Sequence, residues 1–146
     1  MKKIILGYDH KAIDLGQEIE KILQDSGHEV INIGAKDAET RLPLQDLIPD
    51  FVQKFNENKA DFGIISCGTG VGVEIGANKF KGIRASLCHT VEQAQLARQY
   101  DDANVLCLAS WDELDVEKIL STWVETAYDG NEARKNMLDI FDSWGA

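Results

Sequence analysis

The chain has 146 residues, which is enough for one domain with a substantial hydrophobic core. Hydrophobic residues make up 44% of it and charged residues 27%, a composition typical of globular proteins rather than of disordered ones. The formal net charge of −10 argues against a nucleic-acid partner, because nucleic-acid-binding proteins present a basic face. It does not exclude a small anionic substrate, which backbone dipoles can bind locally.

The first half of the chain predicts three strands, each followed by a helix. A strand over 2–7 precedes a helix over 11–27, which Gly27 ends as a C-terminal cap. A strand over 28–34 precedes a helix over 42–59, with Pro43 near its first turn and Pro49 as a possible kink. A strand over 61–67 then runs into a glycine loop and a helix that ends near residue 79.

The second half repeats the same unit twice and adds a helix. A strand over 82–88 is followed by a helix over 90–100, in which Thr90 and Gln93 have the spacing of a capping box. A strand over 104–110 is followed by a long helix over 112–130, and a last helix covers 131–144. The strands are nearly continuous apolar runs, as expected when helices cover both faces of a sheet.

These elements predict an α/β fold with a doubly wound, five-stranded parallel sheet. We expect a Rossmann-like, three-layer α/β/α domain over residues 1–146, with an extra C-terminal helix. Ligands in such folds bind at the carboxyl ends of the strands, near the point where the strand order reverses.

Two loops are expected to open on that edge of the sheet. The loop after the first strand carries Asp9 and His10. The loop after the third strand reads "CGTGVG", which is Cys67, Gly68, Thr69, Gly70, Val71 and Gly72. Glycines let the backbone approach a ligand, and amide groups at the start of the next helix can bind an anion. The positive end of the helix dipole favours a negatively charged group, so Cys67 is a candidate thiolate beside an acid/base pair.

Each of these residues also has a purely structural interpretation. Cys67 could be a small buried side chain at a strand end, Asp9 could cap the first helix, and His10 could lie on the surface of that cap. Cys88 and Cys107 lie in or at the end of strands, where packing is the expected role. His28, His89 and the tryptophans Trp111, Trp123 and Trp144 are expected to be solvated or to serve packing or a subunit interface.

The compartment follows from the N-terminus and the cysteines. The apolar run in "MKKIILGYDHK" is too short for a signal peptide, and no run approaches the length of a membrane span. The three cysteines form no C-x-x-C pair, which argues against a disulfide framework or a zinc site. We therefore expect a cytoplasmic protein without a bound metal.

Four segments resemble the ribose-5-phosphate isomerase B / galactose-6-phosphate isomerase family. They read "GYDHKA", "CGTGVGVEIGANKFKGIRA", "AQLARQYDDANVL" and "YDGNEARKNM", and the resemblance runs from Met1 to about Asp139. It implies the doubly wound fold and an aldose–ketose isomerase of sugar phosphates that uses no metal or organic cofactor. It also implies a dimer or tetramer in which two subunits build each site, with the helix over 131–144 packing on a neighbouring subunit.

The resemblance assigns roles to the two loops. Cys67 would be the base that moves a proton between the first two carbons of the sugar through an enediolate. Thr69 and the amides of residues 68–72 would surround the developing oxyanion. Asp9 would act on sugar hydroxyls and ring opening, and His10 would face the phosphate end.

The chain departs from the family at the residues that would contact the far end of the substrate. Tyr100 stands where the family has a histidine that assists ring opening, and Asp101 stands at the next position. Leu42 replaces a tyrosine. The family's phosphate-binding arginines would fall at Trp111, Glu132 and Asn136. Arg134 and Lys135, or Arg41, are therefore the candidates for holding the acid group.

Three functions remain open from the sequence. The first is an isomerase of a sugar phosphate, of the ribose 5-phosphate or galactose 6-phosphate type, or of an unphosphorylated sugar or uronate. The second is the cysteine-loop subunit of a heteromeric isomerase, with little activity unless a paralogous subunit is present. The third is a non-catalytic module that binds sugar anions, which would leave Cys67 without a role.

Overall fold

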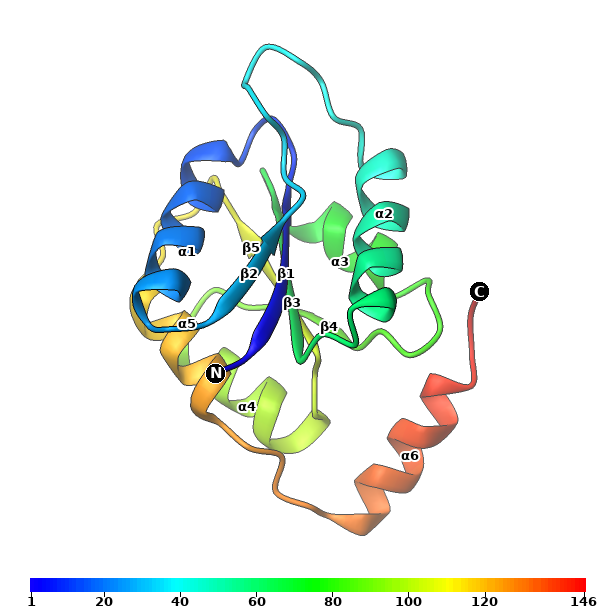
Figure 1. Ribbon diagram of the computed structural model, residues 1–146. Helices are drawn as coiled ribbons and strands as arrows, with labels where there is room; N and C mark the ends of the chain where they lie inside the picture. Colours follow the sequence, from blue (N-terminus) through cyan, green and yellow to red (C-terminus); the bar gives the residue numbers. More distant parts are fainter.

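The computed structural model describes residues 1–146 and has one five-stranded parallel sheet between two layers of helices (Figure 1). The strand order is β2-β1-β3-β5-β4, which confirms the predicted doubly wound α/β fold. The strands are β1 (Lys3–Tyr8), β2 (Glu29–Asn32), β3 (Phe62–Cys67), β4 (Ala85–Leu87) and β5 (Val105–Ala109). The helices are α1 (Ile13–Asp25), α2 (Leu44–Glu57), α3 (Val71–Ala77), α4 (Val91–Asp101), α5 (Val116–Glu125) and α6 (Glu132–Asp142).

The strands are buried on both faces because helices cover both. Helices α1, α4 and α5 cover one face of the sheet, and α2 and α3 cover the other (Figure 1). Neighbouring residues of β1 therefore belong to different cores: Ile4 and Leu6 pack with the first group of helices, and Ile5 packs with the second. This alternation explains why β1, β3 and β5 read as continuous apolar runs.

The strand order reverses between β1 and β3, and this point determines where the loops meet. From β1 the chain moves outward to β2 on one side; from β3 it crosses to the edge strand β4 on the other side and returns to β5, which lies between β3 and β4. Tyr8 pairs with Ser66, and Cys67 pairs with Ala109, so β1, β3 and β5 end at the same level. The connections that leave these three strands therefore surround one position at the carboxyl edge.

Two helix boundaries differ from the sequence-based expectation. The long helix predicted over 112–130 is α5 alone, because the Asp115 side chain caps its start by accepting a hydrogen bond from the Lys118 amide. Helix α5 ends at Glu125, and Thr126 is already extended. The Thr90 side chain accepts from the Gln93 amide, which confirms the predicted cap of α4. Pro49 lies inside α2 without ending it.

Helix α6 lies beside the domain, below and to the right of the sheet in Figure 1. It packs within its own chain through the buried side chain of Leu138 and through Asp142, whose two oxygens accept from Nη1 of Arg84 at 2.8 and 3.0 Å. The terminal residue Ala146 exchanges backbone hydrogen bonds with Lys79 and Lys81. None of the helices combines the length and apolar character that crossing a bilayer requires.

Candidate active site

Asp9 lies directly after β1 and is 6% exposed. Its amide donates to the carbonyl of Ser66 at 3.3 Å, which continues the pairing of β1 with β3. Its carboxylate oxygen Oδ1 accepts from the amide of Lys11 at 3.0 Å and forms a local turn. The expectation that Asp9 caps the first helix is wrong, because α1 begins at Ile13 and has no side-chain cap. The other carboxylate oxygen of Asp9 makes no hydrogen bond within the chain, so it can bind a ligand.

His10 is a fixed residue rather than a free surface side chain. Its ring nitrogen Nδ1 accepts a hydrogen bond from the amide of Leu42 at 3.2 Å, so the ring joins the β1–α1 and β2–α2 connections. A neutral imidazole that accepts at Nδ1 carries its proton on Nε2, and this N–H is a potential donor to a ligand.

The glycine loop follows β3 and is held by the neighbouring loop after β5. The carbonyl of Cys67 accepts from the Ser110 amide at 2.9 Å, and the carbonyl of Gly68 accepts from the Trp111 amide at 3.1 Å. Gly70 has a φ of +74°, a left-handed conformation that side chains disfavour. A Cβ atom at this glycine would also lie 2.5 Å from a methyl group of Leu87. The sequence therefore requires glycine here for both conformation and space.

The amide groups of this loop can stabilise negative charge. The amides of Gly68, Thr69 and Gly70 donate no hydrogen bond within the chain, whereas the Val71 amide donates to the Thr69 hydroxyl at 3.2 Å. Backbone donors without a partner in the chain bind water or a ligand oxygen. Their place beside Cys67 suits an oxyanion that develops next to a thiol.

A hollow of about 180 Å³ connects the two loops. It brings together the three predicted catalytic residues, Asp9, Cys67 and Thr69, and their neighbours Gly68 and Gly72. The remaining lining residues are Lys11, Leu44 and Trp111. The sequence did not assign Lys11 or Leu44 to a site, whereas Trp111 stands where the resemblance would place a phosphate-binding arginine. The placement of Lys11 and Trp111 had a signal in the sequence, because each follows shortly after a parallel strand that ends at this edge.

The other predicted substrate-binding residues lie outside this hollow in the single chain. Gly70 is buried, and Val71 is exposed at the start of α3. Asp101 lines a separate groove, described below. Tyr100 is exposed at the end of α4, where its ring lies 4.8 Å from the guanidinium carbon of Arg134.

The two C-terminal cations are engaged in ion pairs of their own. The Arg134 guanidinium pairs with the carboxylate of Asp129 and donates from Nε to the Tyr100 carbonyl at 3.1 Å. The ammonium of Lys135 pairs with Asp139 at 3.0 Å, one turn further along α6. Both cations belong to α6, so a role for them at the hollow remains a prediction.

The other cysteines are fully buried, in agreement with their expected packing role. Burial raises the pKa of the Cys88 thiol and raises that of Cys107 well above its ordinary value. Cys67 keeps 5% of its surface exposed and lines the hollow, so it is the accessible thiol of the three. No group of three or more histidine, cysteine or carboxylate side chains is arranged to bind a metal ion.

Two histidines outside the loops have specific partners. His28 accepts a hydrogen bond at Nδ1 from the amide of Lys2 at 3.0 Å, so it is not simply solvated as expected. His89, after β4, lies 2.5 Å from the carboxylate of Asp112, and both side chains are 44% exposed. Neither histidine lines the hollow beside Cys67.

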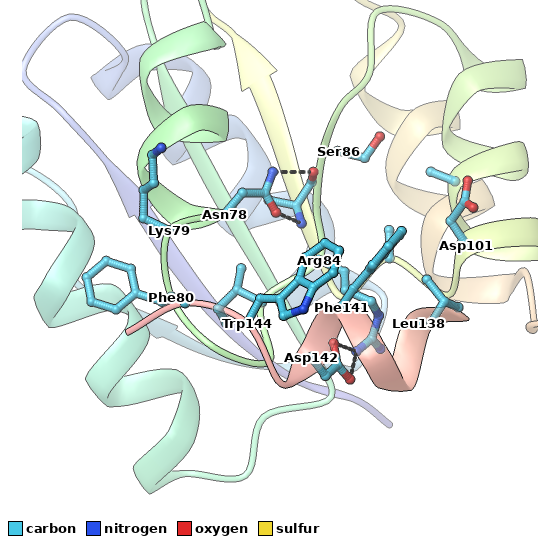
Figure 2. A pocket seen from close by; sticks show the side chains of 15 residues that line it. Asn78, Lys79, Phe80, Arg84, Ser86, Asp101, Leu138, Phe141, Asp142 and Trp144 are labelled. Atoms are coloured by element: carbon cyan, nitrogen blue, oxygen red, sulfur yellow. Dashed lines mark hydrogen bonds and ion pairs between the residues drawn. The ribbon is translucent and has the colours of Figure 1, made fainter. Parts of the chain in front are cut away.

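A larger groove of about 540 Å³ lies between α6, β4 and the ends of α3 and α4 (Figure 2). Phe80, Leu138, Phe141 and Trp144 supply apolar walls, and the Arg84–Asp142 ion pair lies between them (Figure 2). Asn78 closes the free edge of β4, since its side-chain amide exchanges two hydrogen bonds with the backbone of Ala85. This groove contains none of the residues of the hollow.

Comparisons with known proteins bear on the family and the fold. Residues 4–140 match the family described as Ribose/Galactose Isomerase. The chain is 38% identical to ribose-5-phosphate isomerase B of Escherichia coli over 96% of this chain and 95% of that protein. It is 33% identical to 4-deoxy-4-sulfo-D-erythrose isomerase of a Clostridium species, over 75% of this chain and 69% of that protein. The crystal structure of a ribose 5-phosphate isomerase from Thermotoga maritima superposes with a TM-score of 0.90 at 33% identity, covering 98% of this chain and 99% of that one.

Proposed function

The chain belongs to the ribose/galactose isomerase family, and on that premise we propose that it interconverts the aldose and ketose forms of a sugar phosphate through Cys67. The observation that supports this most strongly is the hollow at the switch point of the sheet. Cys67, Asp9 with one unbonded carboxylate oxygen, and Gly68 and Thr69 with unpaired amides line one small volume there. These are the groups that a proton transfer next to a carbonyl requires.

The proposed reaction begins with the open-chain sugar. The Cys67 thiolate takes the proton from the carbon next to the carbonyl, and the electron pair of that C–H bond forms the double bond of an enediolate. The amides of Gly68 and Thr69, which line the hollow, stabilise the charge that moves onto the carbonyl oxygen. The Cys67 thiol then returns the proton to the neighbouring carbon, while a hydroxyl proton moves between the two oxygens. The free oxygen of Asp9 accepts from the sugar hydroxyls.

This reaction needs neither a metal nor an organic cofactor, because every proton is held by a side chain or by the substrate itself. We place it in the cytoplasm, since all three cysteines are free thiols, as a reducing compartment maintains them.

Replacement of Cys67 tests the assignment of the base. Cys67→Ala should lower kcat by roughly 10²–10⁴-fold, the usual contribution of a general base, without loss of folding. Cys88→Ala is the matched control, because it removes a thiol from a buried position away from the hollow. The substrates are ribose 5-phosphate, allose 6-phosphate, galactose 6-phosphate, the sulfonated tetrose named for the Clostridium relative, and unphosphorylated sugars and uronates. A folded Cys67→Ala protein with near-normal turnover would show that another group is the base.

We propose further that the active unit contains more than one chain. Met137, Ile140, Phe141 and Trp144 of the C-terminal segment are exposed in the single chain, and exposed apolar side chains on one helix are typical of an interface. The resemblance implies that two subunits build each site, and a neighbouring subunit that covers α6 fits that expectation. Sedimentation should show a dimer or tetramer at micromolar concentration, and a fully active monomer would contradict the shared site.

The heteromer remains the second candidate because of Tyr100. The Tyr100 ring is stacked with Arg134, and Tyr100 stands where the pattern of the family has the ring-opening histidine. Activity of the purified chain alone would reject this candidate. Activity that appears only after addition of a paralogous subunit carrying the missing histidine would support it.

A further inference from the structure

Lys11 is the one cationic side chain among the residues that line the hollow. Arg134 and Lys135, the cations expected to hold the acid group of the substrate, are instead engaged in ion pairs at α6. The hollow also contains the carboxylate of Asp9, and the whole chain carries a formal net charge of −10. An anionic sugar therefore meets repulsion from the chain in general and attraction from one side chain in the hollow.

The position of Lys11 is fixed by hydrogen bonds on both sides of its backbone. Its amide donates to Oδ1 of Asp9 at 3.0 Å, and its carbonyl accepts from the hydroxyl of Ser110 at 3.1 Å. Hydrogen bonds of Lys11 thus link the β1–α1 loop to the loop after β5. Its side chain is exposed, so the ammonium keeps the freedom to meet a ligand without loss of a buried contact.

The ammonium of Lys11 lies over an aromatic wall of the hollow. Its nitrogen is 5.3 Å from the centroid of the Trp111 ring, within the range of a cation–π interaction. The Trp111 ring lies against Gly68, where a Cβ atom would come within 2.5 Å of the indole. The ring contact therefore places the ammonium at the edge of the hollow, above the same loop that carries Cys67.

We propose that Lys11 binds the terminal oxyanion group of the substrate and so selects acidic sugars. The inference rests on the proposed isomerase function, and it assigns the anion contact to Lys11 in the β1–α1 loop, where His10 is also expected to face the acid group, in place of the cations of the C-terminal helix. A single ammonium is a point charge without the paired donors of an arginine. It can bind a sulfonate or a phosphate, and the two are distinguished by measurement.

Steady-state kinetics of three variants test the role of Lys11. Lys11→Met keeps an unbranched chain on the indole and removes the charge, whereas Lys11→Arg keeps the charge. Lys21→Met is the matched control, since Lys21 lies on α1, is 76% exposed and pairs with Asp25 away from the hollow. Lys11→Met should raise KM for the acidic sugar about tenfold or more, as expected for a charged hydrogen bond, with kcat within about threefold. Lys11→Arg should stay within about threefold of the parent protein in both constants.

The same assays separate the two candidate acid groups. KM is measured for a tetrose or pentose that carries a terminal phosphate, for the version that carries a sulfonate, and for the sugar without an acid group. Lys11→Met should raise KM for whichever acidic sugar the parent protein prefers, and should leave kcat/KM for the uncharged sugar unchanged. An equal effect on the uncharged sugar would overturn the inference, because a lost charge contact cannot act on a neutral ligand.

The outcomes distinguish a failure of this inference from a failure of the proposed function. Turnover of an acidic sugar with an unchanged KM in Lys11→Met would overturn the role of Lys11 and leave the isomerase intact. If the parent protein isomerises none of the sugars, calorimetry with the sugar phosphate and the sugar sulfonate replaces kinetics. Binding lost in Lys11→Met and kept in Lys21→Met would support Lys11; equal binding by both variants, or no binding by the parent protein, would overturn it.

Discussion

Gly68→Ala provides a direct test of the contact between the glycine loop and Trp111. The three atoms nearest to a Cβ at this position all belong to the Trp111 indole, the closest two at 2.5 and 2.6 Å. Ordinary contacts of a Cβ atom begin near 3.4 Å, so the ring must move by roughly 1 Å. Overpacking costs about 1–3 kcal/mol, and we expect the low end because Trp111 is 64% exposed and can shift outward.

The sign of the effect should reverse when the indole is absent. Gly68 does not have a positive φ, so alanine fits its backbone conformation. In a Trp111→Ala background the substitution therefore loses the clash and keeps the entropic benefit of replacing glycine, which is about 0.4–1 kcal/mol. Gly68→Ala should destabilise the parent protein by about 1 kcal/mol and leave the Trp111→Ala protein unchanged or more stable.

Urea unfolding followed by far-UV circular dichroism measures the free energy of unfolding for all four proteins of this cycle. The coupling between the two positions should reach at least about 1 kcal/mol, since contacting residues couple whereas distant ones add. Effects that add within about 0.5 kcal/mol would refute the packing of Trp111 on Gly68. They would also remove the wall on which the Lys11 ammonium lies.

Three further predictions concern buried side chains. Iodoacetamide should alkylate Cys67 before Cys88 and Cys107, because Cys67 keeps exposed surface and burial raises the pKa of the other two thiols. Peptide mass spectrometry measures the order of modification, and modification of Cys88 first would contradict this prediction. The raised pKa of Cys107 means that the folded chain keeps a proton that the unfolded chain releases, so the free energy of unfolding should fall as pH rises past the ordinary thiol value of 9.0. Cys107→Ala should make that fall shallower in urea titrations at stepped pH, and an identical slope would reject the assignment. Trp123→Ala should cost about 3–5 kcal/mol in the same assay, because the indole is fully buried; a loss below about 1 kcal/mol would contradict its role in the core.

The sheet could be predicted from the sequence because its signals are local and repeated. Apolar runs such as Ile4–Leu6 and Ile64–Ile65 are buried on both faces, as is typical of a parallel sheet between two helix layers. The alternation of strand and helix then fixes the doubly wound topology. The spatial order of β5 and β4 does not follow from such patterns, because the sequence does not show beside which strand each helical crossover returns to the sheet.

The meeting of Asp9 and Cys67 was predictable for a related reason. Both lie at the end of parallel strands, and parallel strands that pair in the sheet end on the same edge. The side-chain contacts of these residues were not predictable. Asp9 binds the Lys11 amide instead of capping α1, because the chain makes one more turn before the helix begins at Ile13. That choice depends on a hydrogen bond within the loop, which a periodic pattern does not predict.

The groups that line the hollow are of two kinds: backbone groups, which form a frame, and exposed side chains, which form a rim. The frame is the glycine loop, whose carbonyls at Cys67 and Gly68 are bound by backbone amides of the loop after β5. The rim consists of the side chains of Lys11 and Trp111, which are exposed and carry no core packing. A change at the rim can therefore alter which acid group is bound without moving the thiol or the amides. It follows that proton transfer and acid-group selection should be separable in this protein, with kcat depending on Cys67 and KM on Lys11. A family whose named members act on a sugar phosphate and on a sulfonated sugar is consistent with such a division.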